Sequence, residues 1–225
     1  MTNYYSKKLS SENLKRVYEI ATPRVQQYLN AELEHVIKKI HASDSVLELG
    51  CGYGRIFPSL LKKSKTVVGI DTSLSSLMLG KEMNSSSNCF FAQMNADQLA
   101  FPNNTFDVVL AIQNGISAFH VDKKKLLRES LRVTKPNGVV LFSSYSEKFW
   151  KFRLEWFQLQ SDAGLLGEID FEKTCDGTIV CKDGFTATTV SAQSFHELTA
   201  DIKNISVKTE EVDESSIFCE ITKNY

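Results

Sequence analysis

The chain has 225 residues, of which 42% are hydrophobic and 24% charged, as is ordinary for a globular protein with one sizeable core. The formal net charge is −1 and there is no long basic run, so duplex nucleic acid is not an expected partner. The longest apolar run, 108–112, is far shorter than a membrane span of about 20 residues, and the polar N-terminus contains no signal-peptide core. We therefore expect a cytoplasmic protein without a membrane span.

Two helices are predicted at the start of the chain. The first is short and covers 10–20. Thr22 and Pro23 are then typical of an N-cap followed by proline at the first helical position. The second helix is predicted over 24–41, because its apolar residues keep helical spacing and form one core-facing stripe: Val25, Leu29, Leu33, Val36, Ile37 and Ile40.

From residue 44 onward, short apolar runs alternate with helix-length polar stretches. Strands are predicted over 45–49, 66–70, 89–93, 106–112 and 138–143, and helices over 55–63, 73–83 and 122–134. Asp122 is a start signal for the last helix, and the Lys-Pro-Asn-Gly run at 135–138 is a stop signal. This alternation predicts right-handed βαβ units and a buried parallel sheet.

The C-terminal third has a different pattern. Asp176-Gly177 and Asp183-Gly184 are typical of tight turns, so we expect a small hairpin or meander over 168–190. Ser191 is predicted to cap a helix that runs to about 201. Two strands follow, over 205–210 and 216–222, which brings the predicted number of strands in the main sheet to seven. No repeat or obvious linker divides the chain, so we expect one domain, 1–225.

The glycine-rich stretch VLELGCGYGR, residues 46–55, joins the first strand to a helix. Glycines at such a turn allow a ligand close to the backbone, and Asp71, at the end of the next strand, is placed to bind ribose hydroxyls. Arg55 occupies the position where a dinucleotide site needs a small residue, and Glu48 would repel a pyrophosphate. A cationic ligand without phosphate fits better, and S-adenosylmethionine is one.

At these residues the sequence resembles the class I S-adenosylmethionine-dependent methyltransferases. Their first motif is an acid followed by G-x-G-x-G, matched here by Glu48, Gly50, Gly52 and Gly54. Residues 95–102, NADQLAFP, are similar to the family's adenine segment, with Ala100 in place of the usual proline, and 105–109 and 132–138 resemble its motifs around strands four and five. The cofactor-binding residues that the resemblance implies are Glu48, Gly50, Cys51, Gly52, Gly54, Arg55, Asp71, Thr72, Asn95, Ala96, Asp97 and Gln113.

The resemblance also implies a fold and a substrate class. We expect an α/β, Rossmann-like, mostly parallel seven-stranded sheet with helices on both faces and an antiparallel final strand. Within it, 1–41 would form an N-terminal helical lid, 44–145 the cofactor-binding core, 146–201 a substrate cap with a small β insertion, and 202–225 the final strands. The closest branch is similar to the quinone-biosynthesis methyltransferases, which implies a small-molecule acceptor. We also expect a monomer or homodimer.

No catalytic constellation is needed, because a sulfonium methyl group is already activated and the enzyme mainly aligns the acceptor. A base is required only for a protonated acceptor, and His120, after the fourth strand, is the candidate. The candidate pocket residues are Tyr18, Arg24, Tyr28, Tyr145, Trp150, Arg153 and Trp156. For each of these residues an ordinary core or surface role remains the alternative.

The five cysteines, at 51, 89, 175, 181 and 219, contain no CxxC pair, so neither a metal site nor a disulfide framework is predicted. Cys175 and Cys181 flank one predicted strand, where they could face each other or a soft metalloid. Other functions also stay open: methylation of protein or RNA, or binding of the cofactor without turnover. A nicotinamide-dependent oxidoreductase is disfavoured by Arg55 and Glu48.

Overall fold

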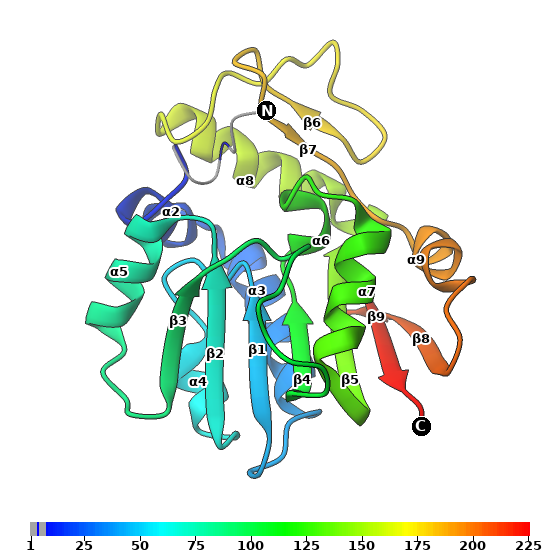
Figure 1. The fold of residues 1–225 in the computed structure, drawn as a ribbon. Coiled ribbons are helices and arrows are strands. Elements are labelled where there is room, and N and C mark those ends of the chain that lie inside the picture. Colours follow the sequence, from blue (N-terminus) through cyan, green and yellow to red (C-terminus); the bar gives the residue numbers. More distant parts are fainter. Residues whose placement is uncertain (1–3, 5–7) are drawn as a thin grey trace.

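The computed structural model describes Tyr4 and residues 8–225, which form a seven-stranded sheet with helices on both faces (Figure 1). The strand order is β3-β2-β1-β4-β5-β9-β8. Neighbours from β3 to β5 are parallel, and β9 runs antiparallel to both β5 and β8. The predicted fold class is therefore confirmed. The strands are β1 (Ser45–Leu49), β2 (Thr66–Asp71), β3 (Cys89–Gln93), β4 (Phe106–Ala111), β5 (Thr134–Tyr145), β8 (Ile205–Val212) and β9 (Ser216–Lys223).

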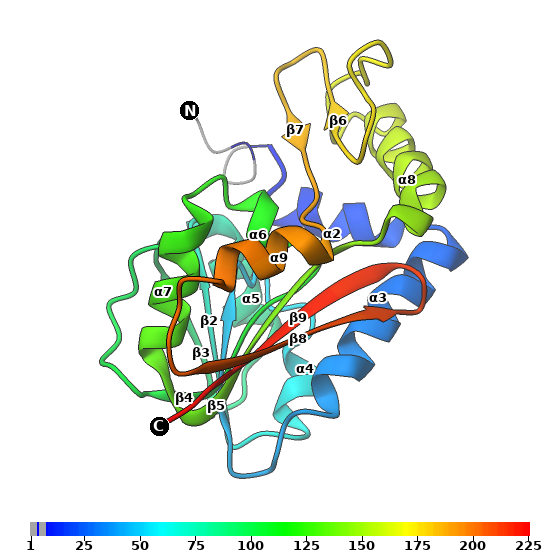
Figure 2. The same ribbon diagram turned by 90° about the vertical axis from the view of Figure 1, so that its right-hand side faces the viewer.

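The helices pack as two layers because successive side chains of a strand point to opposite faces of the sheet. From β1, Val46 joins an apolar cluster with α3 (Pro23–Ile37), α4 (Phe57–Leu61) and α5 (Leu74–Met83). Its neighbour Leu47 joins the cluster on the other face, with α7 (Lys123–Val133) and α9 (Ala192–Thr199). Figure 2 shows α3 and α4 on one side of the sheet and α7 and α9 on the other. Within the described residues, no helix is long and apolar enough to span a membrane.

A third apolar cluster lies over the carboxyl ends of the parallel strands. There α8 (Trp150–Asp162) crosses above the sheet, preceded by the one-turn helix η1 (Glu147–Phe149), and the hairpin of β6 (Ile179–Val180) and β7 (Thr186–Ala187) lies above it (Figure 1). The cluster also takes side chains from α2 (Glu12–Glu19) and α3, such as Val17 and Tyr28. Helix α2, the first turns of α3 and the cap are thus packed together over the carboxyl ends of the parallel strands.

Several local signals act as the sequence predicts. Asp122 Oδ1 accepts the Lys125 N–H at 2.8 Å at the start of α7, and Ser191 Oγ accepts the Ser194 N–H at 3.1 Å at the start of α9. Pro23 occupies the first turn of α3, but the Thr22 hydroxyl makes no capping hydrogen bond. Gly184 has a φ of 91°, as its turn requires.

Other boundaries differ from the prediction for tertiary reasons. β5 begins at Thr134, directly after α7, rather than at 138, and its register against β4 shifts between Phe106↔Thr134 and Val108↔Val139. Asn137, with a φ of 64°, falls inside this irregular stretch. The Lys-Pro-Asn-Gly run therefore bends a strand instead of forming a separate loop. α3 ends at Ile37 rather than 41, and the short helix α6 (Gly115–Ala118) was not predicted.

Candidate cofactor and acceptor site

The glycine loop crosses the carboxyl edge of the sheet between β1 and α4. Gly50 and Gly52 have φ values of 69° and 55°, a region that side chains with a Cβ rarely adopt. A Cβ on Gly50 would lie 2.3 Å from Phe119 Cε1, and one on Gly52 would lie 2.6 Å from Leu14 Cδ2. The loop therefore needs glycine both for its backbone conformation and for the close approach of α2 and of the segment after α6.

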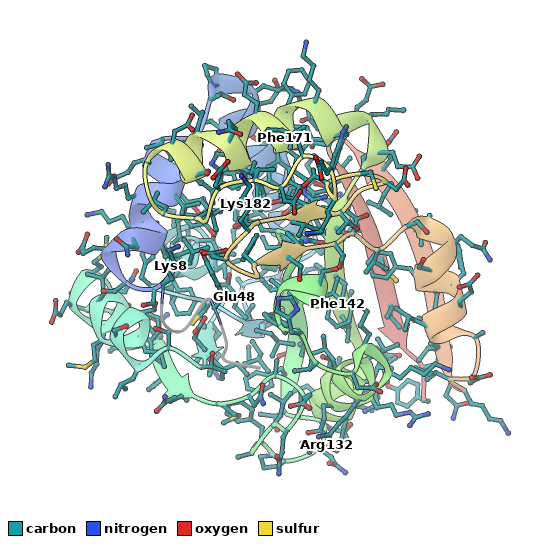
Figure 3. All side chains as sticks on the ribbon, turned by 90° about the horizontal axis from the view of Figure 1, so that it is seen from above. Lys8, Glu48, Arg132, Phe142, Phe171 and Lys182 are labelled. Atoms are coloured by element: carbon teal, nitrogen blue, oxygen red, sulfur yellow. The ribbon has the colours of Figure 1, made fainter. Side chains whose placement is uncertain are left out.

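Beside this loop lies a cavity of about 180 Å³, many times the space that one water needs. It opens at the ends of β1, β2 and β4, the crevice where open α/β sheets bind ligands. Glu48, at this edge, lies near the middle of the molecule when it is viewed from above (Figure 3). The residues that line it include Leu9, Val17, Tyr18, Glu48, Gly50, Cys51, Gly52, Arg55, Asp71, Thr72, Asn95, Ala96, Gln113, Phe119, Tyr145, Trp156, Phe157, Gln160 and Phe185.

Asp71 ends β2 and ties the loop to its neighbours. Its Oδ2 accepts the Gly52 N–H at 2.9 Å and its Oδ1 accepts the Ser73 N–H at 2.8 Å. Burial raises the pKa of this carboxyl, and the backbone N–H groups counteract that rise. Two carboxylate oxygens can together accept about four hydrogen bonds, so Asp71, which lines the cavity, has acceptor capacity beyond these contacts.

Glu48 is only 8% exposed, and no hydrogen bond reaches its Oε2 from the part of the chain that the structure describes. Burial raises the pKa of its carboxyl to about 8, although the Arg55 guanidinium opposes this rise. Buried carboxylates are costly unless they are paired. An acid in this state at a cavity wall favours a ligand with a positive charge.

Arg55 supplies the opposite charge at the same cavity. Its guanidinium lies 4.5 Å from the centre of the Tyr18 ring, and its buried Nη2 has no hydrogen-bond partner among the described residues. Together, Glu48 and Arg55 present one acidic and one basic group, each with an unpartnered buried polar atom. This pair is complementary to a zwitterionic α-amino acid group.

Gln113 follows β4 and also lines the cavity. It has a φ of 55°, and its side-chain Oε1 accepts the Tyr18 hydroxyl at 3.0 Å. Its backbone N–H is shared between Glu32 Oε2 and Ser143 Oγ, each at 2.8 Å. The contact with Tyr18 joins the carboxyl edge of the sheet to helix α2.

Two of the predicted cofactor residues do not line the cavity in the described structure. Asp97 forms an ion pair with Lys125 at 3.1 Å, which directs its carboxylate to α7. Gly54 packs against the rings of Phe91 and Phe57: a Cβ added to it would lie 2.8 Å from Phe91 Cζ and 3.2 Å from Phe57 Cγ. Asn95 and Ala96, from the same motif as Asp97, do line it.

Of the predicted pocket residues, Tyr18, Tyr145 and Trp156 line the cavity, and four others do not. Arg24 pairs with Asp213 at 2.7 Å, and Tyr28 is fully buried between Tyr145 and Phe149. The remaining two, Trp150 and Arg153, pack on each other with the guanidinium 5.7 Å from the ring centre.

Arg153 binds backbone carbonyls of the cap and does not line the cavity in the described structure. It is 1% exposed, and it donates from Nη1 to the Gly177 carbonyl at 2.6 Å and from Nη2 to the Ala187 carbonyl at 2.8 Å. Both carbonyls belong to the hairpin region of the cap. A positive charge buried in this way holds the hairpin on α8, which the aromatic pattern of the sequence did not reveal.

His120 lies outside the cavity in the described structure. Its side chain is exposed and its φ is 51°, while the preceding Phe119 is the residue that lines the cavity. Partial burial, and then the charge of Lys123, lower the pKa of His120. This placement gives no support to a role as catalytic base.

The two cysteines of the cap lie in different environments and form no disulfide. Cys175 is exposed, and Cys181 is buried in the apolar cluster over the carboxyl ends of the strands. Among the residues that the structure describes, no group of three or more His, Cys, Asp or Glu side chains is placed to hold a metal ion.

Sequence reasoning missed Glu32, which is fully buried on α3. Burial raises the pKa of its carboxyl to about 7, against hydrogen bonds from Ser216, Ser143 and Gln113 that lower it. The available signal was its spacing, because Glu32 falls on the stripe of Val25, Leu29 and Val36. Other missed lining residues, such as Phe157, Gln160 and Phe185, come together only through the fold of the cap.

Part of the chain resembles a known protein family: residues 46–138 match the family model described as a methyltransferase domain. This segment runs from β1 into β5, and it includes the glycine loop, Asp71, Asn95 and Gln113.

Curated relatives match over about half of the chain. A ubiquinone/menaquinone biosynthesis C-methyltransferase, UbiE, from Cronobacter sakazakii is 35% identical over 115 residues, which are 48% of this chain and 45% of the relative. An uncharacterized protein from Methanocaldococcus jannaschii is 33% identical over 112 residues, 50% of this chain and 41% of the relative. The matched segments thus span less than half the length of these curated relatives.

Solved structures share the fold over nearly the whole chain. The PH0226 protein from Pyrococcus horikoshii has a TM-score of 0.67 at 20% identity and covers 100% of both chains. The N-methyltransferase NodS from Bradyrhizobium japonicum, solved with S-adenosyl-L-homocysteine, has a TM-score of 0.64 at 14% identity over 99% of this chain and 100% of that one.

The same fold also occurs in a protein with another reaction. The [4+2]-cyclase SpnF has a TM-score of 0.65 at 15% identity and covers 88% of this chain and 82% of its own. The fold alone therefore does not identify the reaction. The methyltransferase-domain match over the glycine loop and the strands that follow it, together with the strand order and the antiparallel β9, makes this part of the chain similar to the class I S-adenosylmethionine-dependent methyltransferases.

Proposed function

We propose that this protein is a methyltransferase that takes S-adenosylmethionine as its cofactor and transfers the methyl group to a small molecule. The observation that carries the proposal is the pair of Glu48 and Arg55, each with an unpartnered buried polar atom at one cavity. The family match and the UbiE relatives support the same reaction class.

The residues present fit the cofactor in three places. Glu48 would accept from the ammonium of the methionine moiety, and Arg55 would hold its carboxylate. Asp71, at the end of β2, would accept from the ribose hydroxyls. The remaining proposed contacts come from the glycine loop and from the ends of β2, β3 and β4: Gly50, Cys51, Gly52, Thr72, Asn95, Ala96 and Gln113.

The cofactor supplies a methyl group that its sulfonium has already activated. The protein's own residues then have to orient the acceptor and exclude water, which together supply much of the acceleration in such reactions. Trp156 and Tyr145 wall the cavity on the side of the cap, and the Trp156 Nε1–H donates to the Val17 carbonyl at 3.0 Å. That bond fixes α8 against α2 and keeps the indole in place.

The cap supports an acceptor of small size. Apart from Glu48, Arg55 and Asp71, the described residues that line the cavity carry no charge. On the cap side they are mainly apolar or aromatic, and they come from α2 and the segment before it, the end of β5, α8 and the hairpin: Leu9, Val17, Tyr18, Tyr145, Trp156, Phe157, Gln160 and Phe185. Mainly apolar and aromatic side chains on this side of the cavity favour a compact acceptor over a polypeptide or an RNA.

The first test is a calorimetric titration with S-adenosylmethionine, S-adenosylhomocysteine and NAD. We expect the first two to bind and Asp71→Ala to weaken both by about tenfold or more, since charge-assisted hydrogen bonds contribute about 1.5–3 kcal/mol. Asp97→Ala is the matched control, because its carboxylate faces Lys125 and not the cavity. Tight NAD binding, or a folded wild-type protein that binds none of the three, would refute the proposed cofactor.

The second test concerns the acceptor. Cell extract is incubated with the protein and cofactor labelled in the methyl group, and then separated into small-molecule, protein and RNA fractions. Label in the small-molecule fraction is the expected result. Label in protein or RNA would contradict the proposed acceptor class, and tight cofactor binding with no labelled product would favour a binding protein without turnover.

A further inference from the structure

Glu32 is a buried acid whose position the reaction itself does not require. It lies on α3 with 0% of its surface exposed, and it does not line the cavity among the residues that the structure describes. No described lysine, arginine or histidine forms an ion pair with it. Burying a carboxylate costs several kcal/mol of desolvation unless hydrogen bonds or opposite charges compensate it, so the hydrogen bonds of Glu32 carry much of that compensation.

The Glu32 carboxylate joins three strands to α3. Its Oε2 accepts the Gln113 N–H at 2.8 Å, just beyond β4, and its Oε1 accepts the Ser216 hydroxyl at 2.7 Å from β9. Ser143 Oγ of β5 accepts the same Gln113 N–H at 2.8 Å, and its hydroxyl lowers the pKa of the Glu32 carboxyl. The carboxylate is thus the centre of a network at the edge of the sheet that carries the cavity.

The segment that this network holds has an unusual backbone. Gln113 and Asn114 have φ values of 55° and 63°, and two successive left-handed residues without glycine are unfavourable unless their surroundings enforce them. Asn114 is fixed separately, because its Oδ1 accepts the Ser144 hydroxyl at 2.8 Å and its Nδ2 donates to the Thr188 carbonyl at 2.9 Å. Glu32 is the carboxylate that holds Gln113.

Gln113 passes this constraint on to helix α2. Its side-chain Oε1 accepts the Tyr18 hydroxyl at 3.0 Å, and the Tyr18 ring in turn lies 4.5 Å from the Arg55 guanidinium. Gln113, Tyr18 and Arg55 all line the cavity. A shift of the Gln113 backbone would therefore move one of the contacts that hold α2 over the proposed cofactor site.

We propose that Glu32 is a positioning residue for this site: through the backbone N–H of Gln113, it sets the Gln113–Tyr18 contact that holds α2 over the cavity. Glu32 touches neither cofactor nor acceptor. The inference rests on the proposed function for its binding measurement, but the placement of α2 can be followed in the protein without ligand.

The test compares two substitutions of similar volume. Glu32→Gln retains an acceptor for the Gln113 N–H, and its amide can donate to the Ser216 oxygen, whereas Glu32→Met loses both contacts. We expect Glu32→Gln to bind S-adenosylhomocysteine within about threefold of wild type, and Glu32→Met to bind about tenfold more weakly. Equal affinity of Glu32→Met and wild type would overturn the proposal.

A double-mutant cycle with Tyr18→Phe separates positioning from general destabilisation. If Glu32 acts through Gln113 and Tyr18, Glu32→Met weakens binding much less when the Tyr18 hydroxyl is already absent. The same loss in both backgrounds would overturn the proposal. Should Glu32→Met fail to fold, Ser143→Ala takes its place in the cycle, with an expected loss of about threefold and the same non-additivity.

Hydrogen exchange of the ligand-free protein supplies an independent readout. Amides of α2, residues 12–19, are expected to exchange faster in Glu32→Met and in Tyr18→Phe than in wild type and Glu32→Gln. Unchanged exchange of α2 in Glu32→Met would refute the positioning role. A wild-type protein that does not bind S-adenosylhomocysteine would instead refute the proposed function, and the exchange data would still decide the role of Glu32.

Discussion

Glu48→Gln is expected to stabilise the ligand-free protein at neutral and higher pH while it weakens cofactor binding. The folded-state pKa of Glu48 is raised from 4.5 to about 8 by burial. Between these two values the folded protein binds more protons at this site than the unfolded chain does, so this carboxyl lowers the stability as the pH rises. Glutamine does not titrate, and the variant escapes this loss.

The size of the effect follows from the shift. Well inside this window one pH unit corresponds to about 1.4 kcal/mol, and the slope falls to half at the folded-state pKa, so from about pH 6 to pH 8 the variant should gain roughly 2 kcal/mol relative to wild type. For a chain of this length, the difference in Tm should widen by about 4–8 °C. At the same time, loss of the carboxylate should weaken the binding of S-adenosylhomocysteine by about tenfold or more.

The assay is thermal unfolding of both proteins, without ligand, at several pH values between about 6 and 8. Glu147→Gln is the control, since the side chain of Glu147 is exposed and solvent screens its charge. A Tm difference between Glu48→Gln and wild type that stays constant across this range would refute the reasoning. So would a variant that becomes less stable than wild type as the pH rises.

Three further predictions address the loop, the cap and the charge of the site. Gly50→Ala should destabilise the protein and weaken binding of S-adenosylhomocysteine about tenfold, because its Cβ would lie 2.3 Å from Phe119 Cε1. Gly164→Ala is the control, since Gly164 has a similar φ and open space around the Cβ position, and it should leave binding unchanged. Equal losses of binding in the two variants would contradict this prediction. Arg153→Met should make the hairpin more sensitive to limited proteolysis, while affinity for S-adenosylhomocysteine stays within about threefold of wild type. Lys151→Met, at an exposed position, is the control. A hairpin that is cleaved no faster than in wild type would contradict the anchoring role of Arg153. Binding of S-adenosylhomocysteine at about pH 7 should release nearly one proton in wild type and almost none in Glu48→Gln, because the ligand's ammonium favours ionised Glu48. Calorimetry in two buffers of different ionisation enthalpy measures the number of protons released. Proton uptake by the wild type would contradict this prediction.

The sequence alone predicted the sheet and most of its helices, because these depend on local periodicity. The strands at 45–49 and 89–93 were predicted at their observed bounds, and the capping positions of Asp122 and Ser191 were predicted correctly. The position of the glycine loop and Asp71 beside a ligand cavity was also predictable, since a strand-loop-helix unit places such residues at the same edge of a sheet. Short-range spacing sufficed for each of these features.

Tertiary structure decided which polar and aromatic side chains meet the cavity. Asp97 and Asn95 lie two residues apart in one motif, yet Lys125 of α7 draws the Asp97 carboxylate away. Arg153 is buried by carbonyl groups of a hairpin more than 20 residues further along the chain. The same holds for Glu32, whose partners Gln113 and Ser216 come from distant strands. Periodicity predicts the face on which a side chain lies, but hydrogen-bond partners are set by which elements pack together, and that becomes definite only in the folded chain.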